Sequence, residues 1–408
     1  NDTYLKVFDA HITKSPARPG NLNNLNNHLK LILNHEKYNF ESGVETYENL
    51  QASKNSDRYQ HILPYYNFDT LLGQKYFDGS INFSSSGSNT LKNTNNLKSN
   101  IINNLTYYSQ DLISDLGIKT NFDINIKNLN SIGKKNPNYK SSPQVEFVSL
   151  LNSEASFPLV KFDDNHENYL TPKVSFRFNP SDMKNYASSS NNIDVGNIFA
   201  TNRLGFSDTY EAGRSLTFGI DYKKENLNDI NKYFEIKLAT ALRDKEEKFI
   251  PRKSTLNRKT SNLFGSVTRN MSENFQLNYN FAIDNDFNKF EYNDFNATFS
   301  INNIITSFNF IEEDGEMGDA NVIENSISYN LSDENYFSFN TRRNRKINLT
   351  EYYNLVYEYK NDCLTAGIKY KKSYYQDRDL KPTEDLLFTV TLFPLTTYEH
   401  DADDLITD

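Results

Sequence analysis

Apolar and polar residues alternate along several segments of the chain. In residues 275–283, every odd position is apolar or aromatic and every even position is polar or small. Further copies of this period, some of them weaker, lie at 174–178, 216–222, 337–339, 353–360, 364–371 and 388–392. A period of two is typical of a β-strand with one apolar and one polar face. Since no long stripe of helical period is visible, the pattern predicts an all-β protein.

The connections between these segments carry a second signal in the last third of the chain. Tight turns are expected at 270–273, 301–303, 331–334 and 361–362, with looser connections at 284–288, 312–321, 343–346 and 375–384. Two Ser- and Asn-rich stretches, 84–96 and 183–197, are expected to be loops. In bacterial membrane barrels the short turns are periplasmic and the longer loops are outside. This alternation predicts a periplasmic C-terminus.

The number of strands favours closure of the sheet. Counting segments from Tyr4 onward gives about twenty strands. An open antiparallel sheet of that size would leave exposed edges, which a barrel removes. We therefore predict a large antiparallel transmembrane β-barrel of the outer-membrane type over residues 1–395, followed by an acidic periplasmic tail at 396–408. A soluble sandwich array or solenoid is the alternative, but neither a fixed repeat nor a domain linker is visible.

Composition fits this prediction once the polar lumen of a barrel is considered. Only 37% of residues are apolar and the mean hydropathy is -0.72, which is too polar for several conventional cores. A large barrel needs apolar side chains only at alternate positions. The apolar runs fall far short of the roughly 20 residues of a membrane helix. A net charge of -9 gives no support to nucleic-acid binding. No signal peptide is visible at the start of the chain, so we expect a mature chain or a fragment.

No pattern of catalytic, metal-binding or cofactor-binding residues stands out. The six histidines are scattered, and no nucleophile motif or phosphate loop is present. A barrel hydrolase assembled from separate strands remains an alternative. The single cysteine, Cys363, follows the tight turn 361–362 and shares strand parity with the polar positions after it. We expect this thiol at the periplasmic mouth, where it would form a disulfide with a cysteine outside this chain; an incidental buried cysteine is the other interpretation.

Six segments stand out in order along most of the chain. They are Asn1–Leu5, Asp57–Pro64 with Arg58 and Pro64, Leu170–Pro172, Asn202–Asp208 with Asn202, Arg203 and Asp208, Tyr359–Leu364, and Tyr374–Pro382 with Asp377, Arg378 and Asp379. Together they resemble segments of the LptD family, also called OstA, of outer-membrane lipopolysaccharide-assembly proteins.

The resemblance implies a non-enzymatic function, the transport and insertion of lipopolysaccharide into the outer leaflet of a Gram-negative outer membrane. Family members have an N-terminal periplasmic jelly-roll and a barrel of about 26 strands, so we expect an incomplete part of a larger barrel. The implied partners are lipopolysaccharide, an LptE-like lipoprotein plug, the lipid bilayer, and an LptA-like bridge protein bound through the missing N-terminal domain. Cys363 would pair with a cysteine of that domain. A passive porin or channel is the alternative function.

Overall fold

The structure, a computed structural model, describes residues 23–50, 52, 58–76, 78–271, 274–374, 382–392 and 396–401. These ranges contain 22 β-strands, one short 3-10 helix, η1 (Arg252–Ser254), and no α-helix. The predicted all-β class is therefore confirmed, and the strand number agrees with the sequence estimate. No helix of the described ranges is long and apolar enough to cross a membrane.

The chain divides into two compact units. The first comprises Asn1–Pro158, Thr171–Gly219 and Ala239–Ser261, and the second comprises Leu159–Leu170, Ile220–Leu238 and Asn262–Asp408. The strands that lie in the first unit are β1 (Asn24–Asn34), β2 (Tyr38–Asn49), β3 (Tyr59–Tyr76), β4 (Gly79–Lys92), β5 (Asn96–Ser109), β6 (Leu112–Ile113), β7 (Lys119–Lys134) and β8 (Gln144–Ser156). Three strands contribute residues to both units: β10 (His166–Asn179), β11 (Gly213–Asn226) and β12 (Asp229–Arg243).

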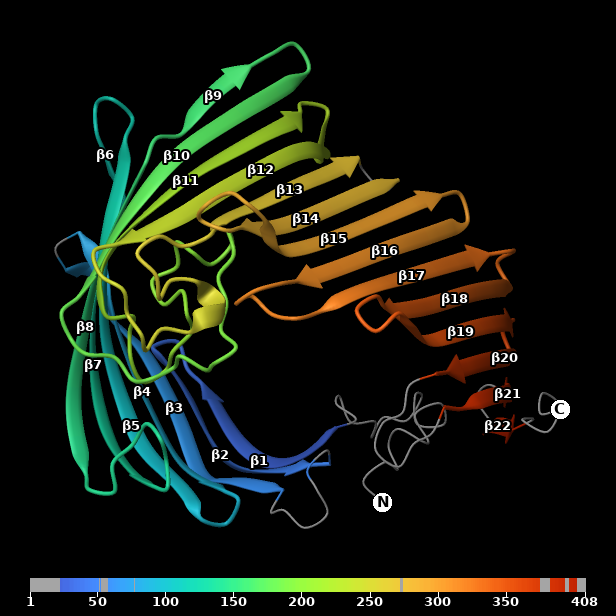
Figure 1. Cartoon of the computed structure of the whole chain (residues 1–408), viewed down its shortest axis with the longest axis horizontal. Helices are drawn as coiled ribbons and strands as arrows, with labels where there is room; N and C mark the ends of the chain where they lie inside the picture. The colour runs from blue at the N-terminus through green and yellow to red at the C-terminus, as the bar shows by residue number, and fades with distance from the viewer. Residues whose placement is uncertain are drawn as a thin grey trace. The chain divides into compact units, whose positions relative to one another are not determined.

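The second unit holds the remaining strands. They are β9 (Leu159–Phe162), β13 (Leu263–Met271), β14 (Phe275–Ile283), β15 (Phe290–Ile301), β16 (Ile304–Glu313), β17 (Asn321–Asn330), β18 (Asn335–Asn344), β19 (Leu349–Lys360), β20 (Leu364–Ser373), β21 (Glu384–Leu392) and β22 (Thr396–Asp401). Each strand from β13 to β21 pairs antiparallel with the next one (Figure 1). The segment of clearest alternation, 275–283, is β14, whose Phe275 packs against Phe299 of β15 with 6.5 Å between ring centroids.

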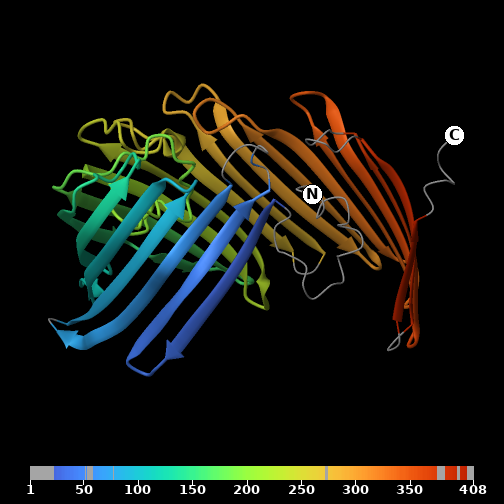
Figure 2. The same ribbon diagram turned by 90° about the horizontal axis from the view of Figure 1, so that it is seen from below.

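In the first unit, antiparallel pairing runs from β1 through β5 to β7 and β8 (Figure 2). One face of this part of the sheet, which we call the apolar face, includes Ile101 of β5, Ile124 and Ile126 of β7, and Val145 and Phe147 of β8. These side chains are between 40% and 68% exposed. A soluble protein rarely exposes a contiguous apolar surface of this kind, whereas a strand in a membrane does so at every second residue.

The opposite side, which we call the polar face, carries Asp123, Asn125 and Lys127 of β7 and Asn152 of β8, all buried. Because strand side chains alternate, one sequence produces both faces. The chain thus has the fold class predicted for it, a large antiparallel β-barrel of the outer-membrane type.

Two expectations about local structure need correction. Residues 84–92 lie within β4 and Asn96 begins β5, so 84–96 is a strand pair joined by a short turn. The serines fit a sheet here because their hydroxyls bond to the neighbouring strand: Ser85 Oγ donates to Asn103 Oδ1 at 2.8 Å, and Ser88 Oγ to Asn100 Oδ1 at 2.9 Å. The segment expected as the start of an acidic tail is also a strand, β22, which pairs with β21.

Other expected connections are found. Residues 183–197 lie in a long connection between β10 and β11, as predicted. The turn 302–303 between β15 and β16 is tight, with Asn302 at a left-handed φ of 50°, and 314–320 between β16 and β17 is longer. The connections 331–334 and 345–348 are equally long, so the alternation of loop lengths holds only in part.

Candidate functional site

Two long connections of the first unit fold over the polar face of its strands. They are residues 180–212, between β10 and β11, and residues 244–261, between β12 and β13; we call them the inner loops (green to yellow in Figure 1). Backbone hydrogen bonds join them, from Tyr186 N to Phe249 O at 2.9 Å and from Arg252 N to Ala187 O at 3.3 Å.

The inner loops have a core of their own. Its fully or almost fully buried apolar members are Ile193, Ile198, Leu204, Phe206, Ile250 and Leu256. Most loops of folded proteins lie on the surface because their backbone groups need water. Here side chains and the neighbouring loop satisfy many of these groups, so the inner loops are a fixed part of the structure.

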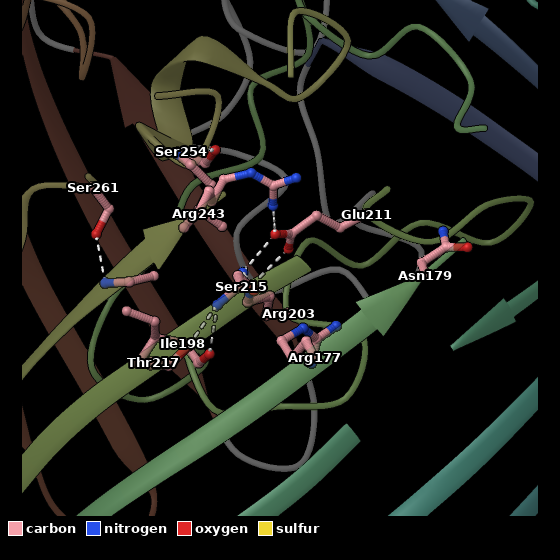
Figure 3. Close-up of polar contacts among 12 residues, drawn as sticks. Arg177, Asn179, Ile198, Arg203, Glu211, Ser215, Thr217, Arg243, Ser254 and Ser261 are labelled. Atoms are coloured by element: carbon pink, nitrogen blue, oxygen red, sulfur yellow. Dashed lines mark hydrogen bonds and ion pairs between the residues drawn. The ribbon is translucent and has the colours of Figure 1, made fainter. Parts of the chain in front are cut away.

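A buried ion cluster ties the first inner loop to the ends of β11 and β12 (Figure 3). Glu211 receives hydrogen bonds from Arg203 Nε, at 2.7 Å to Oε2, and from Arg203 Nη2, at 2.5 Å to Oε1. Arg243, the last residue of β12, also donates through Nη1 to Glu211 Oε1. The three side chains are 0%, 4% and 2% exposed for Arg203, Glu211 and Arg243. Arg203 further donates to Thr217 Oγ1 and Ser215 Oγ of β11, each at 3.0 Å.

The charge of Glu211 depends on these two arginines. Burial alone would raise the pKa of this carboxyl, but the positive charges of Arg203 and Arg243 outweigh burial and lower the pKa to about 2. Glu211 is therefore ionised at neutral pH, although it lies away from water. A buried charge of this kind is tolerated only while its partners stay in place.

A second buried carboxylate, Asp208, anchors the same loop to the loop between β7 and β8. The hydroxyl of Tyr139 donates to Asp208 Oδ2, and the hydroxyl of Tyr186 donates to Asp208 Oδ1 at 2.7 Å. Burial and the adjacent Asp208 charge raise the pKa of both tyrosines. The Tyr186 ring also stacks on Phe206, with 4.3 Å between ring centroids.

Polar side chains of the strands complete the attachment. Asp123 Oδ1 accepts hydrogen bonds from Asn152 Nδ2 at 2.9 Å and from Thr201 Oγ1 at 3.1 Å, which joins β7, β8 and an inner loop. Lys127 donates to Ser207 O, and its Nζ lies 4.4 Å from the centroid of the Tyr210 ring. The polar face thus holds the first inner loop through charged and amide groups.

The structure brings together three of the residues that the resemblance singled out. Asn202, Arg203 and Asp208 all lie in the first inner loop. Asn202 closes a turn, because its Nδ2 donates to Phe206 O at 2.7 Å and its Oδ1 accepts from Phe206 N at 3.2 Å. Gly205 within this turn has a φ of 69°, a conformation that favours glycine.

The other singled-out residues lie elsewhere. Arg58 precedes β3 and pairs with Glu48 of β2 at 2.6 Å, and Pro64 lies within β3. Cys363 is an exposed free thiol in the turn between β19 and β20, where its backbone N donates to Asn361 Oδ1 at 3.0 Å. Asp377, Arg378 and Asp379 lie outside the described residues.

Sequence reasoning missed the partners that complete the ion cluster. Glu211 and Arg243 are 32 residues apart in the sequence and meet only through the pairing of their elements. The sequence did carry a signal for Arg243 and for Arg177 of β10. Ala239 and Ala241 precede Arg243 on the same buried face of β12, and Ser175 precedes Arg177 on the same buried face of β10. Such a position predicts an inward-facing cation that needs a partner.

The arrangement binds loops rather than a metal or a reactive group. Among the described residues, no group of three or more His, Cys, Asp or Glu side chains could hold a metal ion. The ionised groups of the cluster have partners within the protein, which suits a rigid scaffold. The prediction that the chain is not an enzyme stays a prediction.

Comparisons with known proteins give structural neighbours only. No protein family profile matches the sequence. No curated protein matches it either. A ferric enterobactin receptor from Pseudomonas aeruginosa, in complex with enterobactin, is similar over 93% of this chain and 72% of that chain, with 10% identity and a TM-score of 0.38. The siderophore receptor PirA from Acinetobacter baumannii is similar over 90% of this chain and 71% of that chain, with 9% identity and a TM-score of 0.39. The FrpB iron transporter from Neisseria meningitidis is similar over 91% of this chain and 75% of that chain, with 9% identity and a TM-score of 0.35.

These neighbours correct the function expected from the sequence. They are siderophore receptors and an iron transporter, so the expectation of lipopolysaccharide transport is wrong. The residues behind that expectation, Asn202, Arg203 and Asp208, have a structural explanation in the anchoring of a loop. The coarser prediction, an outer-membrane β-barrel protein of a Gram-negative bacterium, agrees with the neighbours. The family relationship, the implied partners and the periplasmic C-terminus stay predictions.

Proposed function

We propose that the chain is part of an outer-membrane channel for polar solutes, in which the inner loops narrow the path along the polar face. A passive porin or channel was the alternative to lipopolysaccharide transport expected from the sequence. The observation that carries the proposal is the buried cluster of Arg203, Glu211 and Arg243, which fixes the first inner loop to the ends of β11 and β12 over the polar face. A loop that is merely exposed to solvent needs no buried ion cluster.

The two faces of the first unit support the same proposal. The exposed apolar side chains suit lipid, and the buried carboxylate and ammonium groups of the opposite side hold the first inner loop beside the path. Selectivity in such a path depends on its width and on the hydrogen-bonding groups along it. Inner loops held in place by ion pairs would set both quantities.

Single-channel recording of the full-length protein in planar lipid bilayers tests this function. The informative variant replaces residues 188–200, within the first inner loop, by a short Gly-Ser linker. We expect the wild-type protein to conduct and the variant to conduct severalfold more, because a shorter loop leaves a wider path. A matched control replaces residues 315–319 of the connection between β16 and β17 and should leave conductance unchanged.

Folding of each protein is verified by its heat-dependent migration on a gel. The proposal is overturned if folded wild-type protein and the folded loop variant both fail to conduct. Equal conductance of the wild type and the loop variant would also overturn the assigned role of the inner loops.

A further inference from the structure

Gly87 of β4 lies at the base of a groove on the apolar face of the first unit. The register aligns it with Tyr66 of β3 on one side and with Ile101, Asn130 and Val145 of β5, β7 and β8 on the other. The Tyr66 ring lies directly over Gly87, since a Cβ added there would be 2.3 Å from Tyr66 Cε1. Beside this ring, a groove of about 420 Å³ crosses these strands.

The lining of the groove combines apolar and hydrogen-bonding groups. Pro64, Ile101, Ile132 and Val145 are its apolar members, and Ile101 and Val145 are 45% and 66% exposed. Asn89, Ser99 and Asn130 are among its polar members, and Ser99 Oγ donates to Asn89 Oδ1. The groove is therefore unlike the uniformly apolar surface that an ordinary bilayer lipid would contact.

A chain of polar side chains runs beside the groove across the same face. The Tyr66 hydroxyl lies 3.1 Å from Ser85 Oγ, and Ser85 donates to Asn103 as described above. Asn103 Nδ2 then donates to Asn128 Oδ1 at 3.2 Å, and Asn130 Nδ2 donates to the same oxygen at 2.7 Å. Hydrogen-bonding groups on a membrane-facing surface are costly unless something with polar groups covers them.

A cation lies on the same face just beyond the residues that line the groove. Lys134, the last residue of β7, is on the apolar face two residues after Ile132, and it is exposed. It pairs in register with Leu97, whereas Ile132 pairs with Ser99. Because a strand rises about 3.3 Å per residue, Ser99 and its partner Ile132 lie about 7 Å from Lys134 along the strand direction. A lipid phosphate and its ester linkages are separated by a similar depth.

We propose that this groove is a binding site for a phosphate-bearing membrane lipid. The Lys134 ammonium pairs with the phosphate, the Asn89 Nδ2 group donates a hydrogen bond to the ester region, and an acyl chain lies over Ile101 and Val145. The occupant is argued from charge complementarity at Lys134 together with the apolar floor. A basic residue near a membrane surface attracts anionic lipid with about 1 kcal/mol, or roughly a fivefold gain in affinity. The site is independent of the inner loops, which cover the other face.

Native mass spectrometry of the full-length protein with added lipid tests the site. Phosphatidylglycerol is the anionic probe, and phosphatidylcholine, which is zwitterionic, is the comparison. We expect one phosphatidylglycerol molecule to be retained about fivefold better than phosphatidylcholine. In Lys134→Gln this preference should disappear, whereas Lys119→Gln, at the other end of β7, should keep it.

A second pair of variants tests the groove itself. Val145→Trp fills it and should lower the retention of both lipids, while Phe147→Trp, on the same face of β8 but outside the groove, should not. Equal retention of the two lipids by the wild type would overturn the proposal, as would equal retention by the two tryptophan variants when both proteins are folded.

Discussion

Arg203 and Glu211 are joined by two parallel hydrogen bonds, from Nε to Oε2 and from Nη2 to Oε1, in a part of the first unit where neither side chain reaches water. This two-pronged geometry matches the planar guanidinium to the carboxylate and is the strongest arrangement that the two groups form. Arg243 shares the same carboxylate. Glu211 therefore balances two buried cations, and the attachment of the first inner loop to the end of β12 depends on its charge.

Removal of that charge should release the inner loops. In Glu211→Gln, two buried guanidinium groups lose their counter-charge, which typically costs about 3–5 kcal/mol. We expect the equilibrium for local opening of the inner loops to increase by at least about two orders of magnitude. Limited proteolysis of the folded protein in detergent measures this opening through the rate of cleavage within residues 180–212.

An exposed ion pair nearby provides the control. Arg214 Nε lies 3.2 Å from Asp244 Oδ2, and these side chains are 61% and 35% exposed. Since exposed pairs contribute about 0–1 kcal/mol, Asp244→Asn should change the cleavage rate by less than about fivefold. Cleavage of Glu211→Gln at the rate of Asp244→Asn would show that the buried cluster does not hold the loops.

The same cluster predicts a response to acid. The pKa of Glu211 falls from an ordinary 4.5 to about 2 because of Arg203 and Arg243. A lowered pKa means that the stabilisation is complete above pH 4.5 and is lost as the pH falls through about 2. The shift corresponds to about 3 kcal/mol. Protease resistance between pH 5 and pH 2, measured with an acid-active protease, should therefore fall more steeply in the wild type than in Glu211→Gln. Parallel curves would contradict this assignment.

Asp208 leads to a prediction about the tyrosine hydroxyls. Tyr139→Phe removes one of the two hydroxyls that donate to this buried carboxylate. A hydrogen bond to a charged group contributes about 1.5–3 kcal/mol, so opening of the first inner loop should increase by roughly tenfold to a hundredfold. Tyr352→Phe is the matched control because its hydroxyl donates to Glu324 at 2.9 Å in the other unit. It should leave cleavage within residues 180–212 unchanged, and an equal effect of both variants would refute a local role.

The alternation of side chains predicted the fold class because it follows directly from strand geometry. The segment 275–283 is an example, since its period alone defines β14. The loop predicted at 84–96 is wrong for residues 84–92, where serines and a glycine stand in place of apolar residues. Those serines are stabilised in β4 by hydrogen bonds to asparagines of β5, and this partner strand is not visible within the segment itself.

The candidate site was predictable only in part, for a related reason. Asn202, Arg203 and Asp208 attracted attention through a resemblance, but the function that it implied was wrong. Their contacts with Glu211, Phe206 and Tyr186 explain them as anchors of a loop. Arg243 and Tyr139 approach these residues only after β7, β8 and β12 have paired, so no spacing in the sequence reveals them.

Cys363 leads to the last prediction, which concerns orientation and pairing. The thiol is exposed in the turn between β19 and β20, and a membrane-impermeant maleimide should therefore reach it from the side on which this turn lies. If that side is periplasmic, intact cells should show no labelling, and permeabilised cells should show labelling.

Reduction should increase labelling if the thiol forms a disulfide with a cysteine outside this chain, because the periplasm is oxidising. Cys363→Ser is the control for specificity and should also change the migration of the full-length protein on a non-reducing gel. Labelling of intact cells would place the turn outside the cell, and labelling that is independent of reduction would exclude the disulfide.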